Sequence, residues 1–389
     1  MLQAVKVNKK YFTKLDLSKI PSPCYVIDTK VLEDNLEVFN QLKTNANVKI
    51  LLALKAFSLK NLFPIISNVL DGVCASGLNE AKLGNKYFGG LISTYSPAFK
   101  DAEFSDIMKY SQHITFNSIS QINKYKKLCI NKKIDVGIRI NPLYSEVEVS
   151  KYNSSNLNSR LGIHLNQLDK LDFTCIKGVH FHSLCEQNFD VLENTWNEIW
   201  PYLKNKVENL EWINLGGGHH ITRSDYNLNK LTNFLLELKK KTNCQIILEP
   251  GEAIVFQSGI LVGEILDYIH GDNDKIPNIG ITDISPVCHM PDVIEAPYRP
   301  FLMNESVKGK KVVLGGPSCL AGDIIGEYNF LKSPNVGDKV VFLDQAHYTL
   351  VKTNFFNGIN HPKVVLWNSD NNDLNIIKSF DFKDFEKRN

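Results

Sequence analysis

The chain has 389 residues, so at a typical domain size of about 150 residues it holds two or three domains and can bury a sizeable core. Its 44 Lys and Arg residues nearly balance its 42 Asp and Glu residues without a long run of one charge, which argues against a protein that binds nucleic acid or a membrane surface. With 43% hydrophobic and 22% charged residues, the composition is that of a folded globular protein whose partners are small molecules.

Targeting signals and cysteines indicate the compartment. The chain lacks a run of the roughly 18 apolar residues that a membrane span needs, and residues 1–17 lack the apolar core of a signal peptide. The eight cysteines lie far apart in the sequence, without a Cys-x-x-Cys pair. This scatter is more typical of reduced thiols than of a disulfide framework, so we expect a cytoplasmic protein.

From about residue 48, short apolar runs alternate with longer amphipathic stretches. The apolar runs are residues 48–56, 71–76, 90–96, 113–117, 134–142, 176–183, 211–218 and 244–250, and the connections between them are long enough for helices. Eight such units in about 200 residues predict an α/β fold with a TIM-like (β/α)8 barrel. A doubly wound open sheet is the structural alternative.

Beyond residue 251 the pattern changes to β-branched runs separated by turns. These runs are residues 253–266, 277–285, 310–316, 338–344 and 362–368, and they predict a second, β-rich domain of sandwich or barrel type. Residues 21–28 form one more predicted strand, which we expect to pair within this second domain. The predicted domains are therefore a barrel of residues 29–254 and a β-rich domain of residues 1–28 together with 255–389.

The barrel's first predicted helix covers residues 28–43, with Asp28 or Thr29 as its N-cap. Polar or glycine residues follow the apolar runs that come after it, and they include Lys55, Ser76, Ser96, Asn117, Arg139, His182, Gly216 and Glu249. In a barrel the carboxyl ends of all strands open onto one face, where barrel enzymes carry their active sites. The sequence thus predicts one shared pocket.

Lys55 is the one charged residue of the apolar run 51–57, LLALKAF. Desolvation lowers the pKa of a lysine, and a neutral amine is what a Schiff base requires; a lysine that extends into solvent at a strand end is the plainer interpretation. Gly216, Gly217 and Gly218 follow the apolar run 211–215. Residues without Cβ let backbone N–H groups converge on an anion such as phosphate, and a simple tight turn is the alternative.

Glu249 ends the last predicted barrel strand. A buried carboxylate there needs a partner, which a protonated heterocyclic nitrogen or a nearby Arg could supply. His180 and His182 alternate with Phe181, so both imidazoles point to the same side of their strand. Such a pair could bind a divalent metal, but further ligands are missing from the sequence pattern, and stacking of an imidazole on an aromatic cofactor is favoured.

Two further candidates lie in the second domain. Cys319 and Asp323 occupy the loop GGPSCLAGD, where a thiol could donate a proton or be an inert structural cysteine. Tyr348 could donate to a phosphate or be a core residue.

Taken together and in this order, the motifs resemble the fold-type III pyridoxal 5′-phosphate (PLP) decarboxylases, the alanine-racemase-like group that includes ornithine and diaminopimelate decarboxylases. The resemblance covers about residues 21–365. It implies PLP as the cofactor, and the residues that would contact it are Lys55 as the Schiff-base lysine, His182 on the ring, Glu249 at the ring nitrogen, and Gly216, Gly217, Gly218 and Tyr348 at the phosphate. It also implies a homodimer with shared active sites, in which Cys319 of the neighbouring subunit returns a proton and Asp323 lies near the distal amine of the substrate.

Two departures narrow the resemblance. Where the ornithine and diaminopimelate enzymes commonly read EPGR and HxGS, this chain reads EPGE, with Glu252, and HSLCEQN. With LGGGHHIT and SPVCHMPDVIEAPYRP, these segments resemble the carboxynorspermidine and carboxyspermidine decarboxylases. A substrate with two further ammonium groups needs acidic partners, for which the candidates are Asp323, Glu252, Asp292 and Glu295, the last three being equally compatible with a surface role.

The implied function is a PLP-dependent carboxy-lyase that releases CO2 from carboxynorspermidine or carboxyspermidine in the biosynthesis of norspermidine or spermidine. Another fold-type III decarboxylase, acting on diaminopimelate or ornithine, is an alternative within the family. From other classes, the alternatives are a metal-dependent barrel hydrolase that uses the two histidines and a non-enzymatic PLP-binding protein.

Overall fold

The structure is a computed structural model that describes residues 12–272 and 275–389. Our expectations for the first 11 residues, which concern the missing signal peptide and the start of the β-rich domain, lie outside the described residues. The described chain divides into two compact units: residues 34–254, and the residues up to 33 together with those from 255 onward.

The first unit is built around a closed barrel of parallel strands. Within residues 34–254, all of them described, the barrel strands are β2 (Lys49–Ala53), β3 (Gly72–Ala75), β4 (Leu91–Tyr95), β5 (His113–Phe116), β6 (Asp135–Asn141), β8 (Gly178–His180), β9 (Trp212–Asn214) and β10 (Gln245–Leu248). The pairing of β10 with β2 and of β5 with β6 closes the ring, and β7 (Ile163–His164) adds to β6. All eight predicted barrel strands are confirmed, and the closed ring excludes the open sheet.

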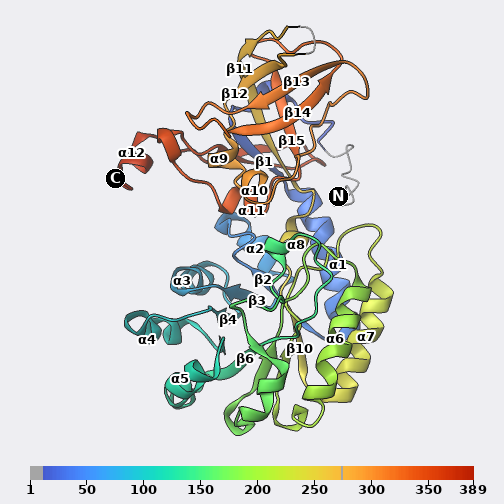
Figure 1. The fold of residues 1–389 in the computed structure, drawn as a ribbon, viewed down its shortest axis with the longest axis vertical. Helices are drawn as coiled ribbons and strands as arrows, with labels where there is room; N and C mark the ends of the chain where they lie inside the picture. Colours follow the sequence, from blue (N-terminus) through green and yellow to red (C-terminus); the bar gives the residue numbers. More distant parts are fainter. Residues whose placement is uncertain (1–11, 273–274) are drawn as a thin grey trace. The chain divides into compact units, whose positions relative to one another are not determined.

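Helices follow most of the barrel strands and flank them on the outside (Figure 1). They are α1 (Thr29–Ala46), α2 (Phe63–Ser67), α3 (Leu78–Tyr87), α4 (Asp101–Tyr110), α5 (Ile119–Asn131), α6 (Phe189–Leu203), α7 (Leu228–Thr242) and α8 (Glu252–Val255). Their apolar spacing explains the packing: α7 buries Leu231, Leu235 and Leu238 on one face. Asp28 caps α1, as predicted, because its Oδ1 accepts the N–H of Lys30 at 3.0 Å.

The amino-terminal end of the barrel is filled by one indole ring. Trp212, the first residue of β9, is 2% exposed and stacks on His113 with 4.8 Å between ring centroids. A Cβ placed on Gly178 would lie 2.0 Å from the indole, and one on Gly137 would lie 2.4 Å from it. The two glycines therefore make room for Trp212, and the chemistry is left to the opposite, carboxyl end.

The second unit contains a sheet of eight strands in the part that the structure describes. They are β1 (Cys24–Asp28), β11 (Gly259–Ile269), β12 (Asn278–Thr282), β13 (Lys310–Gly315), β14 (Ile324–Phe330), β15 (Lys339–Leu343), β16 (Lys363–Trp367) and β17 (Leu374–Lys378). The order is β14-β13-β12-β11-β1-β16-β17, and β15 also pairs with β11. β1 runs antiparallel to β11 and parallel to β16, so the pairing predicted for residues 21–28 is confirmed.

Valine and isoleucine side chains of this sheet form a core that includes Val26, Ile260, Val262, Val341 and Val365. The unit's short helices are α9 (Pro286–His289), α10 (Asp292–Glu295), α11 (Tyr348–Val351) and α12 (Phe382–Glu386). Across the described parts of both units, none of the helices combines the length and the hydropathy of a membrane span.

Candidate active site

Lys55 follows β2 at the carboxyl end of the barrel. Its side chain is exposed to solvent, but desolvation by the surrounding barrel still lowers the pKa of its amine, and the charge of Arg139 acts in the same direction. The Nζ atom of Lys55 lies 3.4 Å from Nε2 of His182. The site thus holds a lysine that gives up its proton more readily than a free lysine, which is the property a nucleophilic amine needs.

His182 follows β8 and is held by its backbone neighbours. Its Nδ1 lies 3.1 Å from both the N and the O atoms of Gly217. Desolvation, and then the charges of Lys55 and Arg139, lower the pKa of His182 well below its ordinary value. The ring is therefore neutral at physiological pH.

Glu249 follows β10, the strand between β2 and β9. Its Oε1 accepts a hydrogen bond from Nδ2 of Asn214 at 2.6 Å, and its Oε2 lies 3.4 Å from Nε2 of His180. Burial acts to raise the pKa of Glu249, but His180, Asn214 and Lys55 outweigh it and lower the pKa to about 2. The carboxylate is thus ionised, and its partners are an imidazole and an amide rather than an arginine.

The three glycines pass closely between the ends of β8 and β10. Gly216 and Gly218 adopt φ angles of 69° and 88°, which favour glycine. A Cβ on Gly217 would lie 2.2 Å from the carbonyl oxygen of Glu249. The N–H of Gly216 donates to Oδ1 of Asn214 at 2.9 Å, and that of Gly217 donates to Nδ1 of His182. The loop therefore orients two site residues, and phosphate binding by it stays a prediction.

Three residues of this site, Arg139, Asn214 and Cys74, were given no individual role by our sequence analysis. Arg139 of β6 is 5% exposed, donates from Nη2 to the carbonyl of His182 at 3.1 Å, and lies over the ring of Tyr95. An arginine inside an apolar run was the available signal. Asn214 and Cys74 gave no comparable signal, since an amide or a thiol at a strand end is ordinary.

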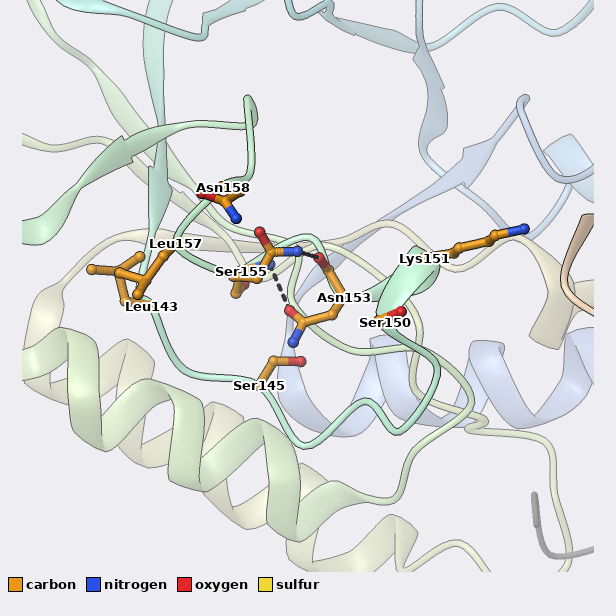
Figure 2. Close-up of a pocket in the computed structure, with 9 residues that line it drawn as sticks. Leu143, Ser145, Ser150, Lys151, Asn153, Ser155, Leu157 and Asn158 are labelled. Atoms are coloured by element: carbon orange, nitrogen blue, oxygen red, sulfur yellow. Dashed lines mark hydrogen bonds between the residues drawn. The ribbon is translucent and has the colours of Figure 1, made fainter.

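The connection between β6 and β7 borders an open pocket of about 730 Å³ lined by Leu143, Ser145, Ser150, Lys151, Asn153, Ser155, Asn156, Leu157 and Asn158 (Figure 2). Asn153 organises this loop, because its Oδ1 accepts the N–H of Ser155 and its carbonyl accepts Nδ2 of Asn156, both at 2.9 Å. Ser145 Oγ donates to the carbonyl of Ser183 at 3.1 Å. The loop is therefore tied to the strand end that carries His182, although none of the predicted site residues lines this pocket.

Glu252 lies next to a second buried histidine. Its Oε1 is 3.8 Å from Nε2 of His220, whereas the adjacent His219 contacts the hydroxyl of Tyr226 at 2.8 Å. No group of three or more His, Cys, Asp and Glu side chains among the residues described is arranged to hold a metal ion.

Asp323 organises two loops of the second unit. It is 3% exposed; its Oδ1 accepts from Ser285 Oγ at 2.9 Å and from the N–H of Val287 at 3.0 Å, and its Oδ2 accepts the N–H of Ser318 at 3.1 Å. Cys319 is exposed in the same loop, and its N–H donates to Oδ1 of Asn357 at 2.9 Å. A thiol in this position is open to solvent and to a partner molecule.

Asp292 and Glu295 both contact Nζ of Lys352, at 2.5 Å and 2.9 Å. Burial acts to lower the pKa of Lys352, but the two carboxylates outweigh it and raise the pKa. Tyr348 begins α11, and its ring centroid lies 5.9 Å from the same Nζ. The predicted site residues thus form two sets, one within each unit.

The set in the barrel fits PLP. It combines an amine of lowered pKa, an ionised carboxylate on the neighbouring strand and a neutral imidazole close to the amine. Both ring nitrogens of His180 are buried without a hydrogen-bond partner. An aldehyde on a protonated pyridine ring calls for these groups: the amine would take the aldehyde, and the carboxylate would take the ring N–H.

Comparison with known proteins gives the same result. The model of the family described as "Pyridoxal-dependent decarboxylase, C-terminal sheet domain" matches residues 24–346. The carboxynorspermidine/carboxyspermidine decarboxylase of Campylobacter jejuni is 38% identical over 95% of this chain and 99% of its own length. The carboxyaminopropylagmatine decarboxylase of Synechocystis is 36% identical over 96% of both chains.

Solved structures agree with these relatives. The crystal structure of the Campylobacter jejuni carboxynorspermidine decarboxylase with norspermidine superposes with a TM-score of 0.87 at 36% identity, covering 95% of this chain and all of that one. A diaminopimelate decarboxylase from Helicobacter pylori has a TM-score of 0.83 at 15% identity and shares the fold. The predicted fold class is confirmed. The chain belongs to the family of pyridoxal-dependent decarboxylases of fold type III, and it is an enzyme that uses PLP to remove a carboxyl group.

Proposed function

We propose that the substrate is carboxynorspermidine or carboxyspermidine, which the enzyme converts to norspermidine or spermidine with release of CO2. The similarity to the Campylobacter jejuni enzyme, at 38% identity over nearly the full length of both chains, is the observation that carries this proposal. The solved relative that holds norspermidine supports a polyamine product. The reaction belongs to polyamine biosynthesis.

Each proposed site residue has a separate role in the reaction. Lys55 would bind the cofactor's aldehyde, and the lowered pKa of its amine supports that role. Glu249 would hold the proton at the ring nitrogen, and His182 would contact the ring. When bound, PLP supplies an electron sink for the electron pair that remains when CO2 leaves. The thiol of Cys319 then donates a proton to the substrate carbon that carried the carboxyl group. The carbon–carboxyl bond is thereby replaced by a carbon–hydrogen bond.

The distal ammonium groups of the substrate require carboxylates. We assign Asp323, Asp292 and Glu295 to this task, with Glu252 as a fourth candidate. The phosphate is assigned to Tyr348 and to the loop of Gly216, Gly217 and Gly218. Lys352 between Asp292 and Glu295 leaves that pair a net negative charge. Such a pair attracts an ammonium group more weakly than two carboxylates without a lysine between them would.

We propose further that the enzyme is a cytoplasmic homodimer whose active sites combine residues of both subunits. The exposed position of Cys319 supports a role in a site completed by a partner. All eight cysteines are free thiols, which supports a reducing compartment.

Spectroscopy and a substrate panel test the proposal. The purified protein is expected to show the visible absorbance of bound PLP, and Lys55→Ala is expected to abolish it, because the covalent link is lost. Release of CO2 is then measured with carboxynorspermidine, carboxyspermidine, carboxyaminopropylagmatine, diaminopimelate and ornithine. Turnover of diaminopimelate or of the agmatine derivative equal to that of the two carboxylated polyamines would contradict the proposed specificity.

A further inference from the structure

His180 is the last residue of β8 and His182 lies two positions after it, and the two histidines contact different residues of the site. His182 lies 3.4 Å from the amine of Lys55, and His180 lies 3.4 Å from Oε2 of Glu249. The role of His182 follows from the proposed function, whereas that of His180 does not.

Glu249 has a polar nitrogen near each of its two carboxylate oxygens. Asn214 donates to Oε1 at 2.6 Å, and the orientation of its amide is set by the N–H of Gly216, which donates to Oδ1 of Asn214 at 2.9 Å. His180 approaches the other oxygen, Oε2. Further ionisable groups that interact with this carboxylate are the amine of Lys55, the guanidinium of Arg139 and the thiol of Cys74. Burial is the main cause that raises the pKa of Cys74. The amide of Asn214 and the imidazole of His180 are thus the polar groups nearest to the two carboxylate oxygens.

The environment of His180 favours a neutral ring that donates one N–H. His180 is 3% exposed, and burial lowers the pKa of its ring even though Glu249 acts in the opposite direction. A neutral imidazole carries one N–H and one acceptor nitrogen. With the N–H on Nε2, the ring stabilises the negative charge of Glu249 without cancelling it.

We propose that His180 is a positioning residue: it donates from Nε2 to Oε2 of Glu249 and, together with Asn214, keeps this carboxylate ionised, so that the proton stays on the cofactor's ring nitrogen. This inference rests on the proposed role of Glu249. The physical reason is competition for one proton. A carboxylate that loses a hydrogen-bond donor becomes more basic and draws the shared proton away from the ring nitrogen.

A purely structural role for His180 predicts a different result. Its ring also packs against Tyr95, with 5.6 Å between centroids and an interplanar angle of 48°. His180→Phe keeps a planar ring in this position and removes the N–H. His180→Gln keeps a donor on a flexible chain. The pair therefore separates packing from hydrogen bonding.

The test reads the proton on the ring nitrogen directly. Holoenzyme is reconstituted with PLP labelled with 15N in the ring, and the chemical shift of that nitrogen is recorded by NMR. We expect the protonated shift in the wild type, a move toward the unprotonated shift in His180→Phe, and partial recovery in His180→Gln. His113→Gln, which changes a buried histidine at the opposite end of the barrel, is the matched control and is expected to leave the shift unchanged.

Kinetics give a second readout. We expect kcat to fall about tenfold in His180→Phe, the size of effect that one hydrogen bond to a charged group can produce, with KM unchanged. Equal nitrogen shifts in the wild type and His180→Phe would overturn the inference. An unprotonated nitrogen in the wild type would instead overturn the role of Glu249 itself, and His180 with it. If His180→Phe does not fold, His180→Leu replaces it in the same measurements, with the same expected outcome.

Discussion

Individual buried histidines make the folded state sensitive to acid. Burial lowers the pKa of His113, His219 and His289 to about 4 each. His289 shows the reason: its Nδ1 accepts the N–H of Ser285 at 3.1 Å, and its Nε2 lies 3.0 Å from the carbonyl of Asn360. A proton added to Nδ1 would face an N–H group, so the folded state keeps the ring neutral.

The sign of this effect can be tested with His289→Gln. An unfolded histidine binds its proton near pH 6.5, whereas folded His289 does so at about pH 4. The contribution of neutral His289 to the free energy of unfolding is therefore complete above about pH 6.5 and is lost as the pH falls to about 4. Between pH 7 and pH 4, we expect the free energy of unfolding of the wild type to fall by up to about 3 kcal/mol more than that of His289→Gln. Urea unfolding at pH 7, 6, 5 and 4 measures the difference; parallel stability curves for the two proteins would count against it.

At the scale of single elements, the barrel depends on a fit between glycines and Trp212. Strands β6 and β8 carry Gly137 and Gly178 where the indole lies across them. Interior packing is dense, so an added methyl group with no space forces the backbone or the ring to move. The amino-terminal end of the barrel is therefore a rigid support for the site at the other end.

Gly178→Ala tests this fit. The new Cβ would lie 2.0 Å from Cδ2 of Trp212, and we expect the free energy of unfolding to fall by about 1–3 kcal/mol or more. Gly77→Ala is the control, because an added Cβ there meets nothing within 4 Å and the φ angle of 173° is open to any residue. Denaturant unfolding of both variants decides the matter: equal losses would show that the contact with Trp212 is not what matters.

At the scale of the whole molecule, the proposed homodimer has a direct consequence for activity. If Cys319 of one subunit serves Lys55 of the other, neither Lys55→Ala nor Cys319→Ala contains a complete site by itself. A hybrid dimer of the two variants would contain one site with both residues intact. If each site used residues of one subunit only, the hybrid would contain none.

Mixing the two variants separates these arrangements. Random exchange in an equal mixture gives hybrids as half of all dimers, so a shared site restores about a quarter of the wild-type CO2 release. Differently tagged subunits, co-purified from the mixture, prove that exchange has occurred. Proven exchange without recovered activity would refute the shared site.

Much of the fold could be predicted because its signals are local. The eight barrel strands read as apolar runs, since strands of a parallel barrel are buried on both faces. β14 and β17 were missed because few of their residues are fully buried: only Ile325 and Tyr328 are in β14, and none is in β17. An exposed edge strand leaves little hydrophobic pattern to detect.

The sequence by itself determined which chemical groups stand at the strand ends, since Lys55, His182 and Glu249 each follow an apolar run. Only the tertiary structure decided how these groups are paired. Asn214 and His180 reach Glu249 because β10, β9 and β8 are neighbours in the ring, and Ser285 reaches Asp323 across a separation of 38 residues. Such contacts depend on strand order and loop packing, which leave no periodic trace in the sequence, so the partners of these side chains are defined only once the barrel and the sheet have folded.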